Sequence, residues 1–103
     1  MVTVADFEKA AEDSRKLVKK PNNDELLELY GLFKVAKAED FSKAVAPGLF
    51  DIRNKAKYNS WKGYVDEGLT AESAQERYVA LVEKLKVTYG YDANKVPEKT
   101  GSD

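Results

Sequence analysis

Apolar residues recur three or four positions apart in four stretches of this chain, a spacing that places them on one face of an α-helix. The first stretch follows Thr3 and Asp6, which form a capping-box pair at a helix start. Because basic residues suit the negative end of a helix, we expect this helix to extend to Lys20 and to end at Pro21.

The second stretch is predicted to begin at Asn22 or Asn23, whose side chains can cap a helix, and to extend to about Ala36. Gly31 lies in its interior, where glycine is less favourable than alanine by up to about 1 kcal/mol. A glycine here indicates that another part of the molecule approaches the backbone closely, although simple tolerance is the plainer explanation.

Residues 39–50 lack this periodicity, and Pro47 with Gly48 is a turn signal. The pattern predicts a loop of about a dozen residues, a length at the upper end of ordinary connections and often associated with function.

Two further helices follow the loop. Asp51 begins the third, which we expect to end near Gly63 or Tyr64, before a connector. Thr70 caps the fourth, and Gly90 suits its C-terminal end.

No strand alternation or internal repeat is visible, so the sequence predicts an all-α four-helix bundle. The length of 103 residues fits one domain, which we assign to residues 1–91. Residues 92–103 are polar, with little to bury, and are expected to form a mobile tail.

Composition and charge exclude several classes of function. The chain has no His and no Cys, which excludes His-assisted nucleophilic catalysis and Cys-based zinc sites. Its 17 basic and 18 acidic residues leave a net charge of -1, which argues against nucleic acid as a partner. No apolar run is long enough for a membrane span, and no signal peptide is visible. We therefore expect a cytoplasmic location.

Two helices carry candidate binding residues. On the third, Arg53, Lys57 and Trp61 are four residues apart and share a face, which is either a solvated basic surface or an anion site. On the second, Tyr30, Phe33 and Lys34 form one patch. An aromatic stripe is usually core, but a fully buried lysine is rare. Aromatic rings beside ammonium groups suit a ligand with a planar base and phosphates.

These segments resemble the acyl-CoA-binding protein family over residues 4–91. Tyr30, Phe33 and Lys34 match its Tyr-x-x-aromatic-Lys segment, and Pro47 begins its Pro-Gly-x-x-Asp turn. The third helix is similar to its Lys-Ala-Lys-aromatic-x-x-Trp pattern, which ends here at Trp61. The start and end of the fourth helix match as well, as does the opening segment after Phe7.

The resemblance implies an up-down-down-up bundle and assigns roles to residues. For the 3'-phosphate and other phosphates of CoA it implies Arg15, Tyr30, Lys34 and Lys57. For the adenine it implies Phe33 and Tyr78. For the acyl groove it implies Ala11, Leu26, Leu27, Arg53 and Ala56. It implies no cofactor and no metal.

The chain departs from the family pattern at several positions. Phe33 stands where tyrosine is common, Tyr58 replaces a usual tryptophan, and Ala46 replaces a common basic residue. The loops before Pro47 and before Thr70 are also longer than usual. These departures bear on affinity and chain-length preference, and they leave the lysines in place.

The function implied by the resemblance is non-catalytic binding of medium- and long-chain acyl-CoA, such as palmitoyl-CoA, as a carrier and pool former in lipid metabolism. Transient contact with membranes or with acyl-CoA-using enzymes would accompany that role. Two alternatives stay open: an interaction module with a weakened ligand site, and an enzyme using a loop carboxylate such as Asp40 or Asp51.

Overall fold

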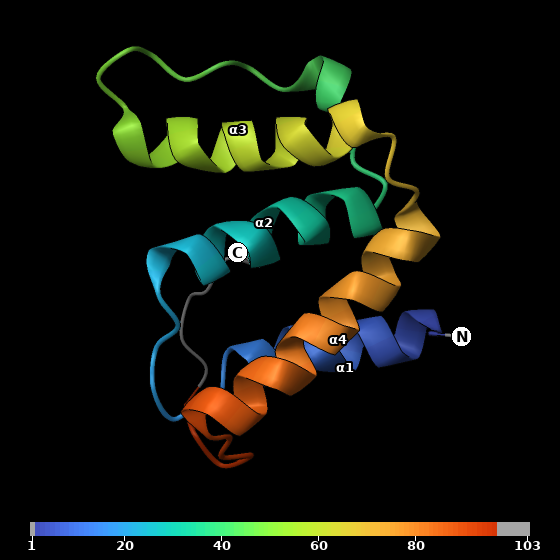
Figure 1. Cartoon of the computed structure of the whole chain (residues 1–103), viewed down its shortest axis with the longest axis vertical. Helices are drawn as coiled ribbons and strands as arrows, with labels where there is room; N and C mark the ends of the chain where they lie inside the picture. Colours follow the sequence, from blue (N-terminus) through green and yellow to red (C-terminus); the bar gives the residue numbers. More distant parts are fainter. Residues whose placement is uncertain (1, 97–103) are drawn as a thin grey trace.

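The computed structural model describes residues 2–96, and its helices confirm the predicted all-α four-helix fold (Figure 1). The elements are α1 (Val4–Ser14), α2 (Asn23–Ala36), the short 3₁₀ helix η1 (Phe41–Lys43), α3 (Ile52–Glu67) and α4 (Ala71–Tyr89). No strand forms within residues 2–96, and the nearest approach to one is an isolated antiparallel bridge between Leu17 and Tyr91.

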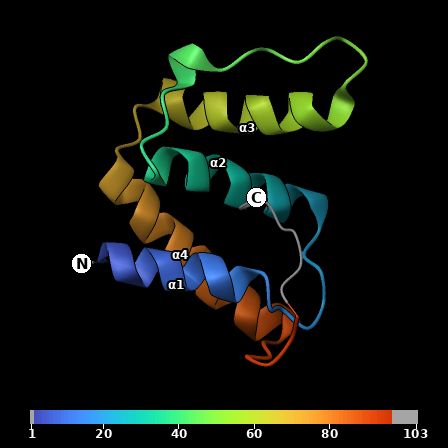
Figure 2. The same cartoon turned by 180° about the vertical axis from the view of Figure 1, so that it is seen from behind.

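Within residues 2–96, the four α-helices pack against one another in three pairs. α4 lies against α1 on one side and α2 on the other, and α3 packs on α2 and on η1. Figures 1 and 2 show α2 and α3 running in the same direction, opposite to α1 and α4, which is the up-down-down-up order. Two parallel neighbours need a connection that returns along their whole length, and the extended residues 44–51 provide it.

The core is concentrated between α1, α2 and α4. Its largest fully buried side chains include Leu29 and Leu32 of α2 and Tyr78, Val82 and Leu85 of α4. By contrast, Trp61 is the one buried residue that α3 contributes. α3 is therefore an outer layer, and most of its surface is available for other contacts.

Side-chain caps explain where the helices begin. Thr3 and Asp6 form a reciprocal capping box at α1, and Asn22 forms one with Glu25 at α2. The hydroxyl of Thr70 accepts a hydrogen bond from the backbone N–H of Ser73 at the start of α4. These caps satisfy backbone N–H groups that have no partner inside the helix.

The first helix is shorter than its apolar spacing indicated. α1 ends at Ser14, so the prediction of a helix extending to Lys20 is wrong. The next residues turn into an extended segment in which the N–H groups of Val18 and Lys19 donate to Gly90 and Tyr89. These tertiary hydrogen bonds bury Leu17 without helical geometry.

The third helix is longer than predicted, because α3 continues through Tyr64 to Glu67. Gly68 then ends it in the left-handed conformation, with φ of 79°. An ion pair between Lys62 and Asp66, 2.7 Å apart, supports the added turn. The connector to α4 is correspondingly short.

The close approach predicted at Gly31 is confirmed. A Cβ atom at this position would lie 2.6 Å from Ser60 Oγ and 2.7 Å from the Tyr64 ring. Ser60 Oγ also donates a hydrogen bond of 2.6 Å to the Leu27 carbonyl. The missing side chain thus lets α3 approach α2 closely along their shared length.

Residues 92–96 continue past α4 and contact the segment after α1. The N–H of Asp92 donates to the Lys16 carbonyl, and Lys95 Nζ donates to the Leu17 carbonyl. The predicted mobile tail at residues 92–103 falls mostly on residues 97–103, which lie outside the described part of the chain.

Candidate ligand-binding site

Two ammonium groups lie over the ring of Tyr30. Lys34 Nζ is 5.5 Å from the centroid of this ring, and Lys57 Nζ is 5.4 Å from the same centroid. Tyr30 and Lys34 share a face of α2 because they are four residues apart, and α3 supplies Lys57. The parallel packing of α2 and α3 therefore unites the two lysine-bearing segments that the sequence singled out.

Lys34 is held in place by neighbours of two kinds. Its Nζ lies 5.4 Å from the Trp61 ring centroid and forms an ion pair of 3.0 Å with Glu39. Its side chain is 24% exposed, so the ammonium group still reaches solvent. A ligand anion would compete with Glu39 for this ammonium group.

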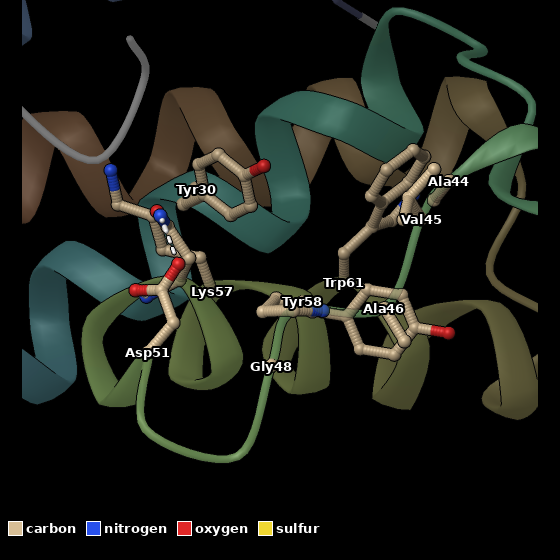
Figure 3. Close-up of a pocket in the computed structure, with 11 residues that line it drawn as sticks. Tyr30, Ala44, Val45, Ala46, Gly48, Asp51, Lys57, Tyr58 and Trp61 are labelled. Carbon is tan, nitrogen blue, oxygen red and sulfur yellow. Dashed lines mark hydrogen bonds between the residues drawn. The ribbon is translucent and has the colours of Figure 1, made fainter.

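Beside Tyr30 and Lys57, the surface is hollowed between α2, α3 and the loop that precedes α3. The hollow has a volume of about 560 Å³. Figure 3 shows Tyr30 and Lys57 towards one end and Tyr58 and Trp61 towards the other. Its lining residues are Tyr30, Ala44, Val45, Ala46, Pro47, Gly48, Asp51, Asn54, Lys57, Tyr58 and Trp61.

An aromatic cluster positions the loop that closes the hollow. The Phe41 ring of η1 lies 4.9 Å from the Trp61 ring and 5.0 Å from the Tyr58 ring, centroid to centroid. This cluster anchors the start of the loop on α3. The sequence assigns none of the loop's lining residues to the ligand site, and the signals for this segment are the length of the loop and its Pro47–Gly48 turn.

Phe33 and Tyr78 adjoin one another, but they differ in accessibility. Phe33 is half-buried, and its ring centroid lies 5.9 Å from that of Tyr78 and 5.6 Å from that of Phe7. Lys37 Nζ lies 5.3 Å from the Phe33 centroid. Tyr78 is fully buried, and its hydroxyl donates to Ser14 Oγ. Tyr78 therefore supports Phe33 from the core side.

The residues assigned to the acyl groove lie on three helices. Leu26 and Leu27 are half-buried on α2, and on α3 Ala56 is half-buried while Arg53 is exposed. The hydrogen bond from Ser60 to the Leu27 carbonyl sets the register between α2 and α3. Because the helices are parallel, these four residues all lie towards the N-terminal ends of α2 and α3.

Ala11 and Arg15 belong to a different part of the molecule. Ala11 is half-buried on α1, and Arg15 is half-buried directly after its last residue. Among the elements in residues 2–96, α1 packs on α4, and α3 packs on α2 and η1. A ligand that reached Arg15 as well as Lys57 would therefore have to extend across α2.

Two other classes of site find no support in the described residues. Residues 2–96 contain no group of three or more metal-ligating side chains arranged to hold a metal ion. None of the described helices combines the length and the apolar composition that crossing a bilayer requires.

Comparison with known proteins identifies the family. The family model described as acyl-CoA-binding protein matches residues 4–82, which include α1, α2, α3 and most of α4. This chain belongs to the acyl-CoA-binding protein family. An acyl-CoA-binding protein homolog from Manduca sexta is 44% identical over 84 residues, which cover 82% of this chain and 91% of the relative.

Two further family members extend the comparison. Acyl-CoA-binding protein homolog 1 of Caenorhabditis elegans is also 44% identical over 84 residues, covering 82% of this chain and 94% of the relative. The crystal structure of Oryza sativa acyl-CoA-binding protein 2 aligns with a TM-score of 0.72 at 29% identity, covering 89% of this chain and 97% of that one.

Proposed function

We propose that this protein binds medium- and long-chain acyl-CoA esters without transforming them, and acts as a carrier and pool former in lipid metabolism. The observation that carries the proposal is the pair of ammonium groups, Lys34 and Lys57, on the Tyr30 ring, which together with Lys57 lines an open hollow. Membership of the acyl-CoA-binding protein family supports the ligand class.

In this proposal, Tyr30, Lys34 and Lys57 hold the ribose 3'-phosphate of CoA. Ammonium-to-phosphate hydrogen bonds are charge-assisted and about twice as strong as neutral ones. A phosphate would replace the Glu39 carboxylate as the acceptor for Lys34, so the Lys34 ammonium group would lose little additional hydration. Arg15 would add positive charge for the remaining phosphates.

The adenine would stack on Phe33, whose half-buried ring is backed by Tyr78 and Phe7. Base–aromatic stacking contributes roughly 1–3 kcal/mol and needs no hydroxyl, so phenylalanine suffices where tyrosine is common. Lys37, close to the same ring, adds positive charge beside the base.

The acyl chain would lie against the N-terminal ends of α2 and α3. Leu26, Leu27, Ala56, Ala11 and the aliphatic stem of Arg53 are the residues proposed to line this groove. Each buried methylene contributes about 0.8 kcal/mol, so a sixteen-carbon chain supplies up to roughly 10 kcal/mol before association costs. The chain would then provide most of the affinity.

The absence of catalysis is part of the proposal. The chain has no His or Cys, and the two loop carboxylates considered as catalytic groups, Asp40 and Asp51, already have structural partners. Asp40 accepts hydrogen bonds from the N–H and hydroxyl of Ser42, and Asp51 caps α3 and bonds Asn54. Incubation with palmitoyl-CoA should therefore release no free thiol.

The same proposal places the carrier in the cytoplasm, in transient contact with membranes and with enzymes that use acyl-CoA. The chain has no cysteine and depends on no disulfide, which suits a reducing compartment. Cell fractionation tests this location.

Calorimetric titration with palmitoyl-CoA, with CoA and palmitate as controls, tests the binding. We expect tight one-to-one binding of the ester and far weaker binding of either part alone. Comparable affinities for palmitoyl-CoA and CoA would contradict the role given to the acyl chain. No binding by a folded, helical sample would instead favour the interaction module as the function.

Substitution of Lys57 tests the phosphate site. Lys57→Ala should weaken acyl-CoA binding by about 1–3 kcal/mol, the scale of one charge-assisted hydrogen bond, and leave the fold intact. Lys62→Ala is the matched control, because Lys62 lies on the same helix but pairs with Asp66. Equal affinities for the two variants would refute the role of Lys57.

A further inference from the structure

The loop before α3 and the first residue of α3 expose a run of large apolar side chains. Val45 is 88% exposed, Leu49 80%, Phe50 97% and Ile52 78%. We call these four residues the apolar tip. They lie within eight consecutive positions. The other exposed large apolar residues in the described part of the chain are scattered: they lie on α1 or just after it, on α4 or after it, and, for Val65, near the end of α3. Soluble proteins rarely leave such a group uncovered without an interaction.

The apolar tip lies at an outer edge of the molecule. In Figures 1 and 2 the loop passes along the side of α3 that faces away from α2, and it is remote from the layer formed by α1 and α4. Nothing in residues 2–96 covers Phe50. A flat surface can therefore reach the tip without a collision with the rest of the fold.

Basic side chains surround the tip. Residues 41–57 contain four basic residues and one acidic residue, although the whole chain has a net charge of -1. Lys43, Arg53 and Lys55 are exposed. The single acidic residue, Asp51, uses its carboxylate to cap α3 and to accept a hydrogen bond from Asn54. The loop and the start of α3 thus carry a net positive charge.

We propose that the apolar tip docks the protein on an anionic lipid bilayer. Exposed apolar and aromatic residues flanked by Lys and Arg match the boundary between acyl chains and anionic headgroups. Residues 44–50 contain no side chain that can donate or accept a hydrogen bond, so the tip offers a protein partner no polar specificity.

Docking would be shallow, because the loop backbone outside η1 makes few internal hydrogen bonds and has to keep water or headgroup partners. The flanking lysines would then lie at the level of the phosphates. The interaction should accordingly be reversible and sensitive to salt.

The tip and the hollow share the same loop. Val45 belongs to the apolar tip and also lines the hollow, together with Pro47 and Gly48. Docking would therefore bring the mouth of the hollow to the lipid surface, where an amphiphilic ester resides. The docking deepens the membrane contact that is part of the proposed function, and this consequence rests on that function.

Co-sedimentation with vesicles tests the docking, using the ligand-free full chain. The vesicles contain phosphatidylcholine alone or phosphatidylcholine mixed with phosphatidylserine. We expect binding to the mixed vesicles, at least about tenfold weaker binding to phosphatidylcholine alone, and a marked loss of binding at raised salt.

The variant Leu49→Ser/Phe50→Ser should reduce binding to the mixed vesicles by about tenfold or more, since two inserted side chains are lost. Val87→Ser/Val96→Ser is the matched control, because these residues are 88% and 79% exposed outside the loop. It should bind like the original protein. Lys43→Gln/Lys55→Gln should weaken binding and flatten its dependence on salt.

Two results would overturn the proposal. One is the absence of vesicle binding by the original protein while it remains folded by circular dichroism. The other is equal loss of binding in the Leu49/Phe50 variant and the Val87/Val96 control. Titration of the same variants with palmitoyl-CoA distinguishes this failure from a failure of the proposed function. If the loop only covers the ligand, the Leu49/Phe50 variant should have an altered affinity for palmitoyl-CoA although the protein does not bind vesicles.

Discussion

The layer formed by α1, α2 and α4 differs sharply from the layer formed by α3 and its preceding loop. The first contains Leu29, Tyr78, Val82 and Leu85, all fully buried. The second buries Trp61 alone among the residues of α3 and exposes the apolar tip. Apolar burial is the main source of stability, so the first layer should determine whether the chain folds.

The difference indicates a division of roles between the layers. Lys57, Tyr58 and most of the lining of the hollow come from α3 and its loop, which bury little and can present side chains to a ligand. α2 belongs to both layers, because Leu29 faces the core while Tyr30 and Lys34 face α3. Substitutions should therefore separate into those that affect stability and those that affect binding.

The largest effect is expected in the core. Leu29→Ala should lower the free energy of unfolding by about 3–4 kcal/mol, because it removes buried methyl groups and leaves a cavity. Leu49→Ala, its matched control in the loop, should change it by less than about 0.5 kcal/mol. Urea unfolding measures both, and similar costs would show that the proposed division between layers is wrong.

The buried carboxylate of Asp13 tests how α1 is held to α4. It lies 2.6 Å from Lys86 Nζ and 3.1 Å from Lys9 Nζ, and it accepts a hydrogen bond from the Tyr91 hydroxyl. Asp13→Ala should cost about 2–3 kcal/mol, because it leaves these donors without their acceptor. Glu83→Ala, which removes the exposed partner of Lys86, should cost much less.

The same group gives a dependence on pH. Burial raises the pKa of Asp13, but hydrogen bonds from Lys86, Lys9 and Tyr91 outweigh burial and hold the pKa below its usual 3.8. A lowered folded-state pKa means that the stabilisation is fully present above pH 3.8 and is lost as the pH falls through the folded-state value. Asp13→Ala should remove this part of the acid sensitivity, as measured by thermal unfolding between neutral and acid pH.

The contact between the layers is tested at Gly31. Gly31→Ala would raise helix propensity by up to about 1 kcal/mol, yet we expect a net loss of about 1–2 kcal/mol from overpacking. The added methyl group would meet Ser60 and Tyr64 and displace α3 from α2. Palmitoyl-CoA affinity should fall as well, and an unchanged affinity would show that the spacing of the two helices does not matter for the site.

The smallest effect concerns the end of α2. Ala38 has φ of 56°, a left-handed conformation that favours glycine. Ala38→Gly should raise the free energy of unfolding by about 0.5–1 kcal/mol, because it relieves this strain. Ala44→Gly, in extended backbone, is the control and should give no gain. Loss of stability in Ala38→Gly would contradict the account.

The sequence predicted the local capping, and it singled out Tyr30, Lys34 and Lys57, which the structure brings together. The capping pairs at Thr3 and Asn22 and the turn at Gly90 act within a few residues, so the sequence displays them directly. The C-terminal ends of α1 and α3 were not predictable. α1 stops at Ser14 because the next residues pair with the chain after α4, far away in the sequence.

The sequence by itself determined the four helices and the family, because these depend on short-range patterns. Only the tertiary structure decided that Lys34 and Lys57 lie on the same ring, that Tyr78 is inside the core, and that residues 44–50 form both a wall of the hollow and an exposed tip. Those relations depend on how α3 packs on α2, which is set by contacts between residues some 30 positions apart.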